Sequence, residues 1–521
     1  MSKIKSNKFI ELSLEQIPRL LGQLNRNPSS VSYGSFDRAY WHYRTNDISC
    51  ARYQEAVYTL VLLYCSDVEG NNYFQDKKLL EYIRASFCFT AGLQRRNGSF
   101  DEWYINEGSY VATAFLVAAL SESIDLFRKN KVVIEEEEEL ILGVLERAAI
   151  FLIRASEQTV MNQVSGAIFA IASVGKLRNN DFFIETAQQL LNHLMSLQSP
   201  EGWWMEYGGP DIGYLTLTIS YLEKYQKLSI TQKNFEPLTE SIQRAKYFVE
   251  KFIAPDVTAG GEYMSRNTEY IIPSETLPYL GAITPTHLDD RYLCYVLYNW
   301  IYTGLIVAPQ KIPGLVNKEE FLNECGILRV VNESYFLVVN GKKGGSLRLY
   351  SKDKNYYDSA VEVSSHHGNF SAGILDDANQ ISFRPGSLHV SGFVKCIKEP
   401  LLKTALSVAF KVWQLLFGRF SFLQRSMKKF LRPQMISYSN RSGIAFERNV
   451  EYGSRVVAIT DIVIGAESRN AILLEAKSAY SAVPSSKYAL AQEFAVCQMV
   501  PVWDEKKDGD TYTIKRTFSF D

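Results

Sequence analysis

Two patterns of apolar and polar positions divide the chain. Up to about residue 308, apolar side chains recur at helical spacing, interrupted at intervals of roughly 20–30 residues by Gly, Asn or Pro. From about residue 327 they alternate as in strands, and Asn340-Gly341 lies between two such runs as a hairpin signal. We therefore predict an α+β protein with a helical half followed by an antiparallel β-half.

The helical half contains an internal repeat with the pattern L-Q-x3-G-x-aromatic-x-E-aromatic-x6-Y. The seven positions recur at an offset of 104 residues. The first copy is Leu93, Gln94, Gly98, Phe100, Glu102, Trp103 and Tyr110, and the second is Leu197, Gln198, Gly202, Trp204, Glu206, Tyr207 and Tyr214. The Gln–Gly–aromatic part resembles the turn between outer and inner helices of α/α toroids, where the Gln binds helix-end backbone groups.

This repeat sets the expected domain organisation. An offset of 104 residues equals two helical hairpins, so residues 30–308 hold five or six of them. We predict an N-terminal helix in 1–29, an (α/α) toroid in 30–325 and an antiparallel β-sandwich domain in 326–521. Inner helices begin after such turns, so Glu102 with Tyr110 and Glu206 with Tyr214 are expected at one end of the central cavity.

The helical half also carries polar residues at helix starts. Asn162 and Gln163 open an otherwise apolar, small-residue helix, and Glu206, Tyr207, Asp211 and Tyr214 surround a Gly-rich turn. Burying amides, carboxyls and phenols costs free energy unless they are paired or used on a ligand. Helix capping and an aromatic core are the alternative explanation.

A long polar loop at 254–290 follows, with Arg266, Asn267, Thr268 and Glu269 side by side. A loop of this length within a compact domain is usually functional or disordered. Its Tyr, Ile and Leu content argues against disorder, so we expect a functional loop.

Composition excludes several classes of protein. The net charge of −1 gives no basic excess for nucleic acid, and the seven cysteines show neither CxxC nor zinc spacing, so neither a metal nor a cofactor is expected. Aromatic residues make up 13% of the chain, which suits a carbohydrate site but also a large core. The first residues lack a signal peptide and no apolar run spans a membrane, which predicts a cytoplasmic protein.

One segment of the β-half, 398–433, departs from this balance. From Lys398 to Arg432 it holds eight Lys and Arg against one acid, Glu399, with apolar residues at helical spacing around Trp413. A basic amphipathic helix of this kind is typical of a peripheral membrane contact. The alternative is a helical insertion whose apolar face packs on the toroid.

These motifs together resemble the heparinase II/III-like polysaccharide lyases and their alginate-lyase relatives. The resemblance rests on a helical toroid before an antiparallel β-domain, Asn162-Gln163, the Tyr-bearing Gly turn and the sequence SRNTE at 265–269. It implies that the Asn-Gln pair neutralises a substrate carboxylate and that a Tyr acts as base or acid. Gln163 stands where His is common in that family, and the family's His-x-His in the β-domain is absent.

The resemblance also distributes roles among the remaining residues. Tyr207 or Tyr214 is implied as the catalytic phenol, and Arg266 with Glu269 matches the loop pair. His366 or its neighbour His367 would stand for the β-domain histidine. We expect Glu206, Asp211, Asn267, Glu102 and Tyr110 to contribute to substrate binding.

The residue types suit removal of the C5 hydrogen of a uronic acid, which lies α to a carboxylate. Amide and guanidinium donors neutralise the charge that develops, and a phenol can take and return a proton. Return to the leaving oxygen gives a lyase, whereas return to the opposite face of C5 gives an epimerase. With the membrane segment, this predicts an acidic surface polysaccharide or a lipid-linked oligosaccharide as the partner.

Three other functions compete with this interpretation. A toroid-type glycoside hydrolase needs two carboxylates beside the scissile bond, and Glu102, Glu206, Asp211 and Glu269 offer pairs. A non-catalytic glycan-binding or scaffold protein fits the low number of histidines, six in all. A terpene cyclase or prenyltransferase would need an Asp-rich box, for which Asp289-Asp290 alone is weak.

Overall fold

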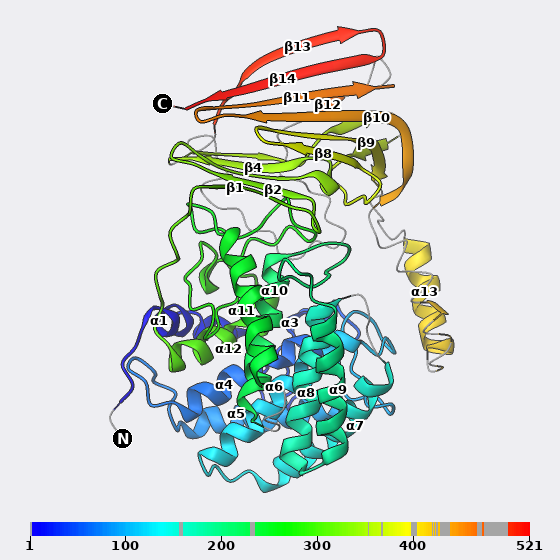
Figure 1. The fold of residues 1–521 in the computed structure, drawn as a ribbon. Coiled ribbons are helices and arrows are strands. Elements are labelled where there is room, and N and C mark those ends of the chain that lie inside the picture. Colours follow the sequence, from blue (N-terminus) through cyan, green and yellow to red (C-terminus); the bar gives the residue numbers. More distant parts are fainter. Residues whose placement is uncertain are drawn as a thin grey trace.

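The computed structural model describes residues 3–155, 160–229, 235–352, 354–365, 368–397, 404–418, 420, 423, 426–427, 438–465, 471–473 and 499–520. A helical domain is followed by two antiparallel sheets (Figure 1). The helices are α1 (Lys8–Leu14), α2 (Ile17–Gln23), α3 (Arg38–Trp41), α4 (Ala56–Cys65), α5 (Lys77–Gly92), α6 (Tyr110–Lys129), α7 (Glu135–Ala155), α8 (Met161–Arg178), α9 (Asp181–Ser196), α10 (Ile212–Lys227), α11 (Phe235–Lys251), α12 (Asp290–Ile306) and α13 (Thr404–Phe417).

The strands form a five-stranded and a nine-stranded sheet. The first has the order β1 (Lys318–Leu322), β2 (Ile327–Val331), β3 (Phe336–Asn340), β4 (Ser346–Ser351), β5 (Lys354–Asp358). The second contains β6 (Glu362–Ser365), β7 (Gly368–Ser371), β8 (Gln380–Arg384), β9 (Ser387–Ile397), β10 (Tyr438–Tyr452), β11 (Val456–Ile464), β12 (Ala471–Leu473), β13 (Val502–Asp508) and β14 (Thr511–Ser519). The predicted succession of helices and antiparallel strands is confirmed.

Helices α4, α6, α8, α10 and α12 form the inner part of the helical domain. Helix α4 contacts α6, α6 contacts α8, α8 contacts α10, and α12 contacts α4. Between α10 and α12, Tyr221 Oη lies 3.4 Å from Tyr298 Oη. Outer helices α5, α7, α9 and α11 contact the inner helices that precede them in the chain. Helix α6 has the length and mean hydropathy of a membrane span, but most of it is buried among these helices.

The repeated glutamines hold their turns, but they bind the middle of the next outer helix and not the helix ends that we expected. Gln94 Nε2 donates to the carbonyls of Gly98 (3.1 Å) and Val144 (2.8 Å), and Gln198 Nε2 donates to those of Gly202 and Ser241 (both 2.9 Å). Both glycines have positive φ, and a Cβ on Gly202 would lie 2.3 Å from a backbone oxygen of α11. Each turn therefore fastens one hairpin to the next outer helix, and α6 and α10 lie two hairpins apart as expected.

The N-terminal segment differs from expectation. We predicted one helix in residues 1–29, whereas the structure has α1 and α2, separated at Glu15 and Gln16. Pro18 lies in the first turn of α2, where a backbone N–H has no partner within the helix. A proline is tolerated at that position, so a second helix begins there. At the other end of the domain, β1 pairs with β2 and begins before residue 326, where we placed the domain boundary.

The five-stranded sheet is buried on both faces. Leu328, Val330, Leu337, Val339 and Leu347 share a core with the nine-stranded sheet. The alternate positions, including Ile327, Phe336 and Val338, belong to the core of the helical domain. The side chains that alternate along these strands therefore face two hydrophobic cores, and not a core on one side and solvent on the other.

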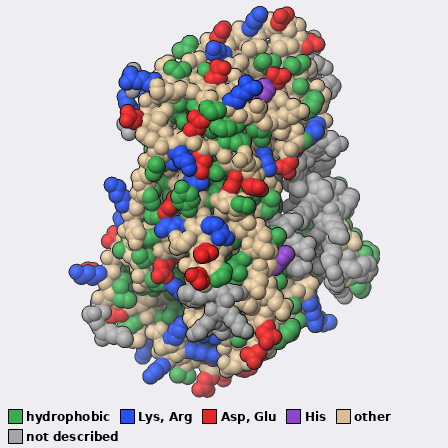
Figure 2. Space-filling model, viewed as in Figure 1, with side chains coloured by type: hydrophobic (Ala, Val, Ile, Leu, Met, Phe, Trp, Pro, Cys, Tyr) green, Lys and Arg blue, Asp and Glu red, His purple; other side chains and the backbone are tan. Residues whose placement is uncertain are grey.

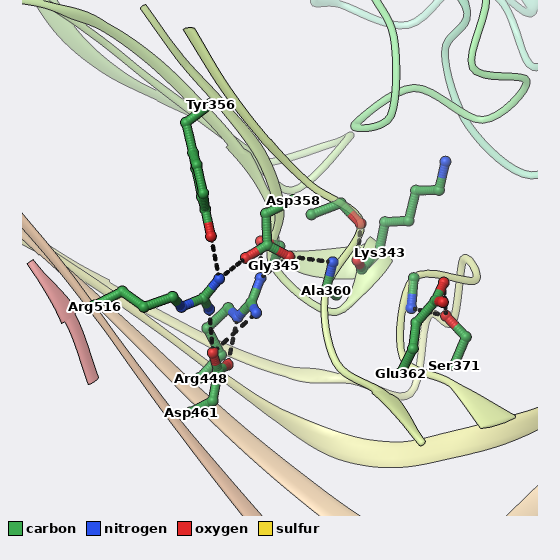
Figure 3. Close-up of polar contacts among 12 residues, drawn as sticks. Lys343, Gly345, Tyr356, Asp358, Ala360, Glu362, Ser371, Arg448, Asp461 and Arg516 are labelled. Carbon is green, nitrogen blue, oxygen red and sulfur yellow. Dashed lines mark hydrogen bonds and ion pairs between the residues drawn. The ribbon is translucent and has the colours of Figure 1, made fainter. Parts of the chain in front are cut away.

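Four fully buried charges join the two sheets (Figure 3). Arg448 of β10 donates to Asp461 of β11 (2.6 and 3.0 Å) and to Asp358 of β5 (3.0 Å). Arg516 of β14 pairs with the same two carboxylates. Two guanidinium and two carboxylate groups balance in charge, which is the condition under which buried ions are tolerated.

This cluster predicts a loss of stability in acid. Burial alone would raise the pKa of Asp358, but Arg448 and Arg516 hold it at about 2. An unfolded Asp has a pKa of about 3.9, so the stabilisation is complete above that value and is lost as the pH falls towards 2. Urea unfolding should show a decline of about 2–3 kcal/mol from this group between pH 5 and pH 2. A free energy of unfolding that stays constant over this range would contradict the assignment.

Candidate active site

The site begins where α8 and α10 start. Residues Val160 and Glu206 form a short antiparallel bridge beside the start of α8. Glu206 accepts from the backbone N (2.7 Å) and the Nδ2 (2.8 Å) of Asn162. Burial raises the pKa of Glu206 well above its ordinary value, although the hydrogen bonds from Asn162 oppose this shift. Glu206 therefore fixes the Asn162 amide, whose second Nδ2 hydrogen is available to another acceptor.

Asp211 organises the loop that faces α10. Its carboxylate accepts from the backbone N of Tyr214 (3.2 Å) as a helix cap, and from the backbone N of Arg266 (3.1 Å) and Thr268 (3.3 Å). A Cβ on Gly213 would lie 2.6 Å from Thr268 Oγ1, so only glycine permits this approach. Asp211 is fully buried and holds the loop against the start of α10, and its contact with substrate stays a prediction.

Arg266 lies between the two candidate phenols. Its Nη2 donates to Tyr214 Oη (3.2 Å), and its guanidinium carbon lies 4.1 Å from the ring centroid of Tyr207 and 5.5 Å from that of Tyr214. The Tyr207 side chain is 36% exposed, and its backbone has a φ of 55°. Three predicted residues thus meet at one place.

The Arg266 guanidinium is buried but not saturated. Within the described part of the chain it forms no ion pair, and its Nε and Nη1 have no hydrogen-bond partner. Burial would lower its pKa, but Tyr214, Tyr207 and Asp211 raise it, so the group stays charged. Burying a charged guanidinium whose N–H groups have no acceptor costs free energy, unless a bound anionic ligand accepts hydrogen bonds from them.

The first copy of the repeat forms a second polar cluster at the start of α6. Glu102 Oε1 accepts from Arg291 Nη2 (2.9 Å), and the Arg291 guanidinium carbon lies 3.9 Å from the exposed Trp103 ring. Tyr110, the first residue of α6, is half-buried. Glu102 and Glu206 therefore hold different partners, Arg291 and Asn162, although they occupy equivalent positions in the repeat.

Asn267 and Glu269 connect the loop to the β-domain. Lys343 Nζ, after β3, donates to Asn267 Oδ1 and to the Met264 carbonyl (2.6 Å). Glu269 forms a buried ion pair with Arg348 of β4, which also binds Glu262 (2.8 Å). The two residues of the predicted loop pair therefore have different partners. Arg266 contacts the two candidate phenols, whereas Glu269 forms an ion pair with an arginine of the β-domain.

The remaining predicted site residues are Gln163 and the histidines of the β-domain. Gln163 is half-buried beside Asn162 at the start of α8, so the polar pair stays at the site. His366 and His367 lie outside the described residues. The β-domain reaches the site through Leu375, since a Cβ on Gly209 would lie 3.4 Å from its Cδ1.

No family model matches the chain, and no curated protein matches it. Among solved structures, the chondroitin AC lyase of Streptomyces coelicolor A3, in complex with chondroitin sulphate, superimposes with a TM-score of 0.54 at 8% identity. The match covers 86% of this chain and 65% of the lyase. This chain has a polysaccharide-lyase fold.

Two other lyase structures are also similar. Heparinase III matches 99% of this chain and 91% of its own at 13% identity, with a TM-score of 0.46. A Paenibacillus xanthan lyase matches 88% of this chain and 45% of its own at 10% identity, with a TM-score of 0.49. The chain thus spans about two-thirds or less of the chondroitin and xanthan lyases, and identities this low establish the fold alone.

On this polysaccharide-lyase fold, the four carboxylates considered for a hydrolase are all buried. Glu206 binds Asn162, Asp211 caps α10, and Glu102 and Glu269 pair with arginines. A hydrolytic pair must instead flank the scissile bond and reach water. Among the described residues, the geometry therefore disfavours the hydrolase.

Arg291 and Lys343 were not predicted as members of this candidate site. Arg291 lies in the first turn of α12, and Lys343 lies in the connection after β3, far from the residues that they contact. The repeat offered one signal for such residues. Trp103 and Tyr207 occupy equivalent positions in it, and in the structure each ring has an arginine over it. Their partners could not be read from spacing.

Proposed function

We propose that the protein is a polysaccharide lyase that cleaves a uronate-containing chain by β-elimination, with Tyr214 as the base. The observation that carries this proposal is the buried Arg266 guanidinium, which donates to Tyr214 Oη while two of its other nitrogens have no partner among the described residues. The guanidinium fixes the position of the phenol oxygen and keeps a positive charge beside it. The remaining N–H groups can bind the substrate carboxylate.

The reaction follows from these contacts. The Tyr214 phenolate takes the C5 proton, the electron pair forms the C4–C5 double bond, and the C4–O bond breaks. The phenol then returns its proton to the leaving oxygen, so that protons and charge balance within one cycle. One group can serve first as base and then as acid because both transfers occur at neighbouring atoms.

Carboxylate neutralisation is the second requirement. Removing the C5 proton moves negative charge onto the substrate carboxylate, and fixed donors stabilise that charge without reorganisation. Arg266 supplies a cation, and Asn162, held by Glu206, supplies an oriented amide hydrogen. Gln163, on the next position of α8, supplies a further amide group.

The arrangement of the inner helices and of the two sheets is part of the same proposal. We take the inner helices as an (α/α) toroid and the two sheets as a sandwich, supported by the order of helix contacts and by the core shared between the sheets. The site then lies at the toroid end that faces the β-domain, where Lys343 and Leu375 approach it. We further place the substrate among surface polysaccharides or their lipid-linked precursors, which suits a chain with a membrane-binding segment.

One experiment separates lyase, epimerase and binding protein. Purified protein is incubated in D2O with heparosan, alginate and capsule oligosaccharides, and unsaturated uronate is followed by ultraviolet absorbance and C5 deuterium by NMR. Absorbance supports the lyase. Deuterium at C5 without absorbance would replace it with a C5-epimerase. Oligosaccharide binding with neither signal would leave a non-catalytic glycan-binding or scaffold protein.

A further inference from the structure

Helix α13 stands apart from the rest of the β-domain. It lies in the connection between β9 and β10, and in Figure 1 it extends alongside the helical domain. It contacts that domain through few side chains: Phe410 packs on Tyr104 (ring centroids 5.3 Å apart), and the Gln414 carbonyl accepts from Asn106 Nδ2 (3.2 Å). The helix is therefore attached by one narrow face.

The opposite face of α13 is apolar and uncovered. Val408, Val412, Leu415 and Leu416, which we call the α13 apolar face, are each 50–59% exposed. Hydrophobic side chains are visible at the same edge of the molecule in Figure 2. Part of the apolar surface of the helix does pack on the helical domain, through Phe410 on Tyr104 and Trp413 beside Ile105, whereas the α13 apolar face stays exposed. A contiguous exposed apolar helix face marks an interaction site.

Charge identifies the partner. Between Lys398 and Arg432 the sequence has eight basic residues and one acidic residue, whereas the whole chain balances 56 Lys and Arg against 57 Asp and Glu. Lys411 is the described basic residue of α13, and it lies 3.3 Å from Asp47 in an exposed ion pair. The other seven basic residues of this segment lie outside the described residues. In the sequence, apolar residues at helical spacing combined with an excess of basic residues match the interface of a bilayer that contains anionic lipids.

A second copy of the chain fits this surface less well. Pairing two α13 apolar faces would also bring two strongly basic segments together, and like charges oppose such an interface. Phe417 and Phe420 are also exposed at the end of the helix. Aromatic side chains are favourable at the boundary between headgroups and acyl chains.

We propose that α13 docks the protein on an anionic lipid bilayer through its apolar face. Docking would bring the membrane beside the loop at 101–109, because Tyr104 and Asn106 of this loop hold α13. That loop also carries Glu102 and Trp103 of the site region. The lipid interaction does not depend on catalysis, so the proposal stands or fails separately from the lyase activity.

The test is co-sedimentation of the full-length protein with vesicles. Binding to vesicles of phosphatidylcholine with phosphatidylglycerol should exceed binding to pure phosphatidylcholine at least about tenfold and weaken with salt. The double variant Val412→Asp with Leu416→Asp should lower it by about tenfold or more. The matched control, Val133→Asp with Leu140→Asp, changes two exposed apolar residues elsewhere and should bind like the unmodified protein.

Thermal unfolding establishes that the variants remain folded, and a milder pair, Val408→Ser with Leu415→Ser, should show the same direction of change. Absence of sedimentation with anionic vesicles would overturn the proposal. So would equal binding by the Val412→Asp and Leu416→Asp variant. A dimer that this variant converts to a monomer, without vesicle binding by the unmodified protein, would assign the surface to self-association instead.

Discussion

Changing Tyr214 to phenylalanine is expected to lower turnover of a uronate-containing oligosaccharide by about 10²–10⁴-fold. The substitution removes the hydroxyl that accepts from Arg266 Nη2 and keeps the ring on α10. Loss of one half-buried hydrogen bond costs about 1 kcal/mol of folding stability, so the protein should remain folded. Initial rates of unsaturated uronate formation and a thermal unfolding curve measure the two effects.

Tyr207→Phe is the matched control for this prediction. Its ring also packs on Arg266, whereas Tyr214 is the phenol that we propose as the base, so a smaller loss of activity is expected from Tyr207→Phe. Equal losses in both variants would indicate that the phenols share the proton transfer. A Tyr214→Phe variant with unchanged turnover would exclude this residue as the base.

Changing Asp461 to asparagine is expected to destabilise the protein by about 3–5 kcal/mol. Asp461 is fully buried and accepts from Arg448 at 2.6 and 3.0 Å and also pairs with Arg516. Asparagine has a similar shape but no charge, so one positive charge would remain uncompensated between the sheets. Urea unfolding followed by tryptophan fluorescence measures the change.

Asp290→Asn provides the control for this prediction. Asp290 accepts from Arg19 Nε (2.7 Å), and the Arg19 and Asp290 side chains are 34% and 49% exposed. Exposed pairs contribute about 0–1 kcal/mol, so the control should change little. Similar effects of the two substitutions would show that the buried cluster does not stabilise the contact between the sheets.

The helical fold was predictable where local chemistry repeats. The Gln94 and Gln198 turns carry a pattern that recurs at one offset, and both glutamines form equivalent hydrogen bonds, although to the middle of the next outer helix and not to a helix end. The five-stranded sheet was predictable as strands but not as a doubly buried layer. Alternation in the sequence shows that two faces differ, and it does not show what covers each face.

The site was predictable in its residues more than in its contacts. Arg266, Tyr207 and Tyr214 were recognised and do come together. The partner of Glu269, however, is Arg348, which belongs to another domain. Such pairs form only after the chain has folded, so spacing along the sequence carries no signal for them.

The middle sheet, whose two faces complete two cores, also limits how the chain can be divided. A fragment ending after α12 would expose the helical side of the missing sheet, and a fragment starting at β1 would expose the strands that cover it. Neither piece keeps the buried pairing of Arg348 with Glu262. The boundary between the helices and the strands is therefore a change of architecture and not a seam at which the protein separates into autonomous modules.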